Sequence, residues 1–105
     1  MNDLTRRLAH SYVDKDGSEL ELLDWAKKFE DFSYRVIISD ELPDHRLVQT
    51  WWHGLRVPVN GTWPFGTAVF APGPNPWPRE IDQYDTMEAA LQGHTKHVEE
   101  LRRSL

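Results

Sequence analysis

Apolar residues recur at helical spacing near the start of the chain. They fall at i, i+3, i+4 and i+7, which is the pattern of one face of a helix. The residues are Leu22, Trp25, Ala26 and Phe29. The pattern predicts a helix over residues 21–31 that packs against a core.

The same spacing predicts a second, longer helix over residues 87–104. Thr86 precedes it as an N-cap, because a threonine hydroxyl can accept a hydrogen bond from the first helical turn. The stripe expected to face the core comprises Met87, Leu91, His94, Val98 and Leu101. Gly93 weakens the middle of the helix by about 1 kcal/mol relative to alanine. We expect this glycine to allow a close approach between the helix and a sheet.

Between the two helices, the chain changes to short runs rich in β-branched and aromatic residues, which are typical of strands. The runs occupy 34–39, 46–55, 65–72 and 79–85. Pro43 lies in a turn between the first two, which predicts an antiparallel hairpin. In the last run, Ile81 and Tyr84 are one residue out of phase, so this fourth strand is short. The sequence predicts an α+β fold: a three- to four-stranded antiparallel sheet with two main helices packed on one face.

Length and composition limit the domain count and the functional classes. A chain of 105 residues suffices for one domain, expected over 12–105, with 1–11 as a leader or short helix. The net charge of −5 argues against direct nucleic-acid binding, which needs a basic surface, and a nucleic-acid mimic would be more acidic. The absence of cysteine excludes disulfides and thiolate metal sites. No apolar run approaches the roughly 20 residues of a membrane helix. We expect a cytoplasmic protein.

The tryptophans are the strongest functional signal. Trp51 and Trp52 are adjacent on a predicted strand, so their side chains point to opposite faces of the sheet. We place Trp52 in the helix-covered core and Trp51 on the open face, where Trp63 and Trp77 from proline-flanked loops can meet it. The candidate partner-binding residues are Gln49, Trp51, His53, Trp63 and Trp77. The alternative is that the loop tryptophans simply cap a small core.

Metal and catalytic motifs are weak. His94 and His97 are spaced to share a metal with His53, but His94 lies on the apolar stripe and no acidic residue completes a known motif. The acidic turn at 14–18 lacks the remaining ligands of an EF-hand loop. No serine lies in a nucleophile elbow, and no glycine-rich phosphate loop is present. We therefore predict no metal, no cofactor and no catalytic residue.

Most of the chain, residues 12–98, resembles a family of small, uncharacterised proteins encoded by actinobacterial phages and related bacterial genomes. The resemblance is carried by "YVDKDGSELELLDWAKKFED", "YRVI", "LVQTWWHGL", "FGTAVF" and "DTMEAALQGHTKHV". Family members tend to have Asp-His where this chain has Arg56-Val57, and Glu where it has Gly66. The resemblance implies the fold and an accessory role in a phage, and it implies no enzymatic activity.

These observations favour a binding protein over an enzyme. The leading hypothesis is a phage-type accessory protein that binds a host or defence protein stoichiometrically, as an inhibitor or modulator. The alternative is a small-ligand-binding domain with an aromatic pocket between the sheet and the Trp/Pro loops.

Overall fold

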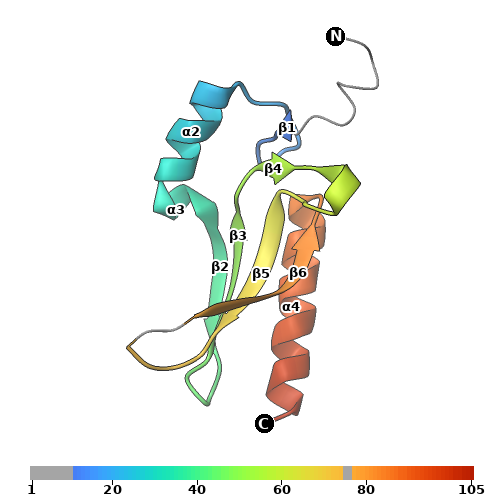
Figure 1. The fold of residues 1–105 in the computed structure, drawn as a ribbon. Coiled ribbons are helices and arrows are strands. Elements are labelled where there is room, and N and C mark those ends of the chain that lie inside the picture. Colours follow the sequence, from blue (N-terminus) through green and yellow to red (C-terminus); the bar gives the residue numbers. More distant parts are fainter. Residues whose placement is uncertain (1–10, 75–76) are drawn as a thin grey trace.

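The computed structural model describes residues 11–74 and 77–105, and its centre is a four-stranded antiparallel sheet (Figure 1). In sheet order the strands are β2 (Val36–Glu41), β3 (Leu47–Trp52), β5 (Phe65–Phe70) and β6 (Pro78–Tyr84). With two main helices beside this sheet, the predicted α+β fold is confirmed. The strand predicted over 65–72 ends at Phe70, before Pro72 and Pro74, which cannot donate to a strand ladder.

A second sheet of two short strands lies beyond one end of the large sheet (Figure 1). Its strands are β1 (Ser11–Tyr12) and β4 (Leu55–Arg56), and the 3₁₀ turn η1 (Pro58–Asn60) follows β4. The strand predicted over 46–55 is therefore split in two, because the chain turns at Gly54 with a φ of 75°. A Cβ on Gly54 would come within 2.8 Å of the Trp25 ring. The turn therefore requires glycine for both its backbone angle and its lack of a side chain.

The predicted first helix is confirmed as α2 (Leu22–Glu30), and a one-turn helix, α3 (Phe32–Arg35), follows it directly. The Asp31 side chain caps α3 by accepting a hydrogen bond of 3.3 Å from the backbone N–H of Tyr34. The strand predicted over 34–39 was placed too early for this reason, and β2 runs two residues further, to Glu41. Trp25 of α2 packs against the core at this end of the large sheet.

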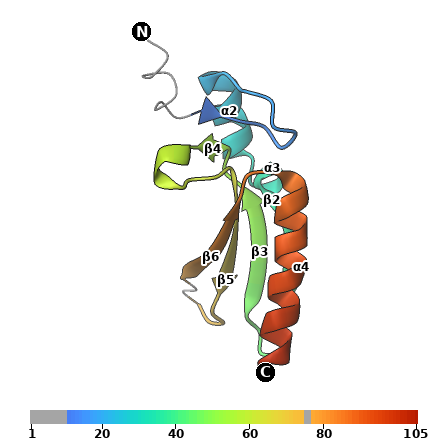
Figure 2. The ribbon, with the colours of Figure 1, turned by 90° about the vertical axis from the view of Figure 1, so that its right-hand side faces the viewer.

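The long helix α4 (Met87–Arg103) runs along one face of the sheet (Figure 2). Thr86 is its N-cap, as predicted, and accepts a hydrogen bond of 3.1 Å from the backbone N–H of Ala89. Gly93 faces the Tyr84 ring, so the expected close approach to the sheet is confirmed. The helices of the described segments include none long and apolar enough to cross a membrane.

The predicted core stripe of α4 is wrong at one position. The buried residues of the helix are Ala90, His94 and Val98, whereas Leu91 is 42% exposed. Ala90 and His94 lie three and seven residues after Met87 and share the buried face of the helix. Leu91, four residues after Met87, lies just beyond the edge of that face. The sheet approaches α4 on the alanine side because Gly93 brings the helix close to Tyr84.

Trp52 is the centre of the core, as predicted. Its side chain is 0% exposed and forms a cluster with Phe65, Tyr84 and Ala90. Its indole N–H donates to the Val13 carbonyl at 2.9 Å, so the one polar atom of the ring is satisfied. A second cluster of Leu42, Val48 and Val98 lies toward the other end of α4.

A β-bulge in β6 explains the phase change seen in the sequence. Thr67 pairs with Asp82 and the next residue, Ala68, pairs with Glu80, so Ile81 is an extra residue in the strand. From the bulge toward its start, β6 diverges from α4, and both views show this divergence (Figures 1 and 2). A pocket lined by residues of β5, β6 and α4 lies between these elements, and we call this region the wedge.

Candidate functional site

Trp51 lies on the sheet face opposite Trp52, as predicted, but it is half-buried. Its ring meets the edge of Phe70 with centroids 6.2 Å apart. The Arg35 guanidinium lies 5.3 Å from the Trp51 ring centre and 4.0 Å from that of Phe29. Partial burial of the Arg35 guanidinium lowers its pKa. The two cation–π contacts stabilise the charged form of this group. Trp51 is thus a packing partner of Arg35 within the chain.

Three further candidates, Gln49, His53 and Trp63, are buried or half-buried. Gln49 is buried and donates a hydrogen bond of 3.0 Å to the Ser39 hydroxyl. His53 accepts a hydrogen bond from the backbone N–H of Leu55 at 3.1 Å, and burial lowers the pKa of His53 despite a hydrogen bond with the Trp63 backbone. Trp63 itself is half-buried. Gln49 and His53 therefore each form a hydrogen bond within the chain.

Trp77 differs from the other candidates because 84% of its surface is exposed. It does not join Trp51 on the open face of the sheet, since it lines a pocket together with Leu101 of α4. Of the predicted group, Trp77 therefore lies on the other side of the sheet from Gln49 and Trp51.

The pocket beside Trp77 has a volume of about 300 Å³ and occupies the wedge between the β5–β6 hairpin and α4. Its lining comes from four parts of the fold: Arg46 before β3, Val69 and Ala71 at the end of β5, Trp77, Arg79 and Ile81 along β6, and Leu101 on α4. Most of these side chains are apolar. The pocket is open to solvent, so a side chain from another molecule can enter it without any movement of the backbone.

The charged residues of this lining are both arginines. The Nε of Arg46 is 2.7 Å from an Asp44 carboxylate oxygen, and this contact neutralises its charge. Arg79 is exposed and forms no ion pair with any residue in 11–74 or 77–105. No carboxylate is among the lining residues. The wedge is therefore apolar at its base and positively charged at its rim, in a chain whose net charge is −5.

The β-bulge determines this charge. Arg79 pairs with Val69, which places both residues on the α4 side of the sheet. If Ile81 were paired regularly with Ala68 and did not bulge, Val69 would pair with Glu80 instead. The bulge thus places a guanidinium, and not a carboxylate, at the pocket.

Comparisons with known proteins give no match. No protein-family model, no curated protein and no solved structure is significantly similar to the chain.

A chain of hydrogen-bonded polar side chains between α4 and the sheet, most of them buried, resembles a catalytic relay in its composition. The Nε2 of His94 is 2.7 Å from an Asp40 carboxylate oxygen, and its Nδ1 is 2.8 Å from the Thr50 hydroxyl. The Thr50 hydroxyl is in turn 2.5 Å from that of Thr67, which is 3.0 Å from the Tyr84 hydroxyl. Thr50 and His94 are fully buried, so no substrate can reach this hydroxyl. The network satisfies polar groups in the core.

The histidines that suggested a metal site are each paired with an aspartate. His94 contacts Asp40, and the Nε2 of His97 is 2.9 Å from an Asp82 carboxylate oxygen. Within residues 11–74 and 77–105, no group of three histidine or acidic side chains is arranged to hold a metal ion. The sequence interpretation of His94 as a hydrogen-bonded packing residue is confirmed.

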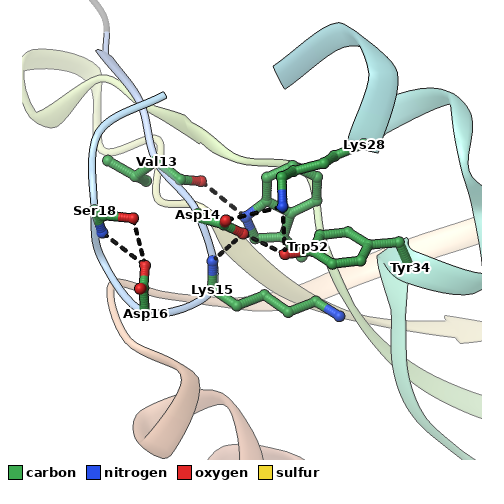
Figure 3. A network of polar contacts seen from close by, with 8 residues as sticks. All are labelled: Val13, Asp14, Lys15, Asp16, Ser18, Lys28, Tyr34 and Trp52. Carbon is green, nitrogen blue, oxygen red and sulfur yellow. Dashed lines mark hydrogen bonds and ion pairs between the residues drawn. The ribbon is translucent and has the colours of Figure 1, made fainter. Parts of the chain in front are cut away.

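A second polar network, shown in Figure 3, explains the acidic turn at 14–18. Asp14 accepts hydrogen bonds from the Tyr34 hydroxyl and from the Lys15 backbone N–H, and its carboxylate is 3.0 Å from Lys28 Nζ. Partial burial would raise the pKa of Asp14, but these contacts outweigh it and lower the pKa. The Lys15 ammonium lies 3.8 Å from the centre of the Tyr34 ring. Asp14 therefore ties the turn to α2 and α3 over the core.

Sequence reasoning missed most of the Trp77 pocket. Arg46, Val69 and Leu101 are far apart along the chain, and they meet because β3 pairs with β5 and α4 packs across the sheet. The available signal was the pair Ile81 and Tyr84, whose phase change marks the bulge.

Proposed function

We propose that the protein acts by stoichiometric binding of another protein, and that Trp77 with its pocket is the contact surface. The observation that carries this proposal is a tryptophan with 84% of its surface exposed beside an open, mainly apolar pocket. Tryptophan is enriched among the residues that dominate binding energy, because it contributes large contact area and few rotatable bonds. A partner that covers Trp77 would remove this apolar area from water.

Binding, and not catalysis, is the activity that we propose. The most relay-like group of side chains, Asp40, His94 and Thr50, has its hydroxyl buried in the core. The Trp77 pocket itself carries no pair of acid and base groups. The resemblance to phage-encoded proteins suggests a host protein in the cytoplasm as the partner.

The pocket also supports a second candidate function, the binding of a small ligand. Its volume of about 300 Å³ is at the lower end of the range of small-molecule sites. Such sites usually enclose most of the ligand, however, whereas this wedge is open along one side and Trp77 projects from its rim. We therefore favour a protein partner.

The proposal is tested by comparing captures from a host lysate with three immobilised forms of the protein: wild type, Trp77→Ala and Leu23→Ala. Leu23 is the matched control, because it is also an exposed large apolar residue, but it lies on α2 at the other end of the sheet. We expect wild type and Leu23→Ala to retain one host protein at a fixed molar ratio of partner to immobilised protein. We expect Trp77→Ala not to retain it.

The unfolding midpoints of all three forms should agree, because both changed side chains are exposed. The proposal would be refuted if Trp77→Ala retained the same proteins as wild type. A change in melting temperature with a metabolite panel, abolished by Trp77→Ala, would instead favour the small-ligand function.

A further inference from the structure

We infer that the Trp77 pocket takes an acidic segment of its partner: an apolar side chain in the wedge, flanked by a carboxylate at Arg79. This inference rests on the proposed function and names the chemistry of the partner. It is carried by the charge and polarity of the lining residues.

The apolar part of the pocket sets the first requirement. Val69, Ile81 and Leu101 are half-buried and contribute apolar surface from β5, β6 and α4. A volume of about 300 Å³ accommodates one large apolar side chain with room at the mouth. Trp77 at the rim can then cover part of the inserted side chain.

The charge of the rim sets the second requirement. Arg46 has its carboxylate partner in Asp44, at 2.7 Å, but Arg79 has no ion pair within the described segments. A guanidinium presents several N–H donors that match the two oxygens of a carboxylate. With no acidic residue in the lining, Arg79 is the group that a partner's aspartate or glutamate would meet.

The overall charge of the chain makes this local pattern selective. Acidic residues outnumber basic ones by 17 to 12, so an acidic partner is repelled by most of the surface. Arg79 provides a local attraction beside the apolar pocket, which fixes the register of the bound segment. A basic segment would be attracted elsewhere on the surface and repelled at this pocket.

The inference is tested with a random peptide library displayed on yeast. The library is sorted for peptides that bind labelled wild-type protein, and peptides that also bind Trp77→Ala are removed. We expect the recovered peptides to combine a large apolar residue with neighbouring aspartates or glutamates. The affinity of the best peptide should fall by about tenfold or more with Arg79→Glu, which replaces an attraction by a repulsion. The control Lys27→Glu makes the same change in net charge at an exposed site on α2 and should leave the affinity unchanged.

The outcomes separate the two proposals. If the peptides depend on Trp77 but are neutral or basic, or if Arg79→Glu binds them as wild type does, the acidic segment is refuted and the binding surface stands. If no recovered peptide depends on Trp77, both proposals fail. If benzoate displaced the peptide at a concentration similar to that of the peptide, the pocket would be assigned to small acids. Self-association abolished by Trp77→Ala would assign it to a second copy of the chain. Each of these two results overturns the inference.

Discussion

Replacing Gly93 by alanine sets two physical effects against each other. Gly93 lies within α4, where alanine is the better helix former by about 1 kcal/mol. Helix propensity alone therefore predicts that Gly93→Ala stabilises the protein. The packing of α4 on β6 predicts the opposite.

A Cβ at position 93 would come within 2.5 Å of the ring carbon Cζ and the hydroxyl oxygen of Tyr84. Tyr84 cannot move aside easily, because it is buried in the Trp52 cluster and its hydroxyl is 3.0 Å from that of Thr67. Inserting a methyl group into a packed core typically costs about 1–3 kcal/mol, and a lost buried hydrogen bond adds about 1 kcal/mol. After the propensity gain is subtracted, we expect Gly93→Ala to destabilise the protein by about 1–3 kcal/mol.

Urea unfolding followed by tryptophan fluorescence measures this difference. Thr95→Ala is the control, since Thr95 is exposed on the same helix and should gain a few tenths of a kcal/mol, about the propensity difference. In a Tyr84→Ala background, the methyl group has room, so Gly93→Ala should become neutral or stabilising. An increase in stability from Gly93→Ala in the wild-type background would refute the close approach of α4 to Tyr84.

Two further predictions concern the core and the response to acid. Trp52→Ala should lower the free energy of unfolding by about 3–5 kcal/mol, because the side chain is 0% exposed. Leu91→Ala should lower it by less than about 0.5 kcal/mol, because that residue is 42% exposed, and equal losses in urea would contradict the placement of α4. Asp14 has a lowered pKa, so it contributes stability above its ordinary pKa of 3.8 and loses it as the pH falls through the folded value. Asp14→Asn should therefore be less stable than wild type at pH 7, by about 1–3 kcal/mol, and the two should converge in acid; parallel stability curves would refute the contribution of this carboxylate.

The fold could be predicted from the sequence where the pattern is local. The period of apolar residues in α4 and the threonine cap at its start are properties of a few neighbouring residues, and both predictions are confirmed. Alternation along β3 correctly separated Trp51 from Trp52 for the same reason. The prediction that Leu91 faces the core was wrong because either Ala90 or Leu91, three or four residues after Met87, could continue the apolar stripe. The approach of Tyr84 to Gly93 decides between them.

The candidate site could be predicted only in part, because its composition depends on a departure from regular pairing. A tryptophan beside prolines indicates an exposed aromatic residue, and Trp77 is one. Regular alternation along β6, however, would place Glu80 opposite Val69 and make the rim of the wedge acidic. The extra residue Ile81 reverses the faces, so that Arg79 pairs with Val69. The departure of one residue from regular pairing thus places a guanidinium, and not a carboxylate, at the pocket, and on it depends our proposal of an acidic partner segment.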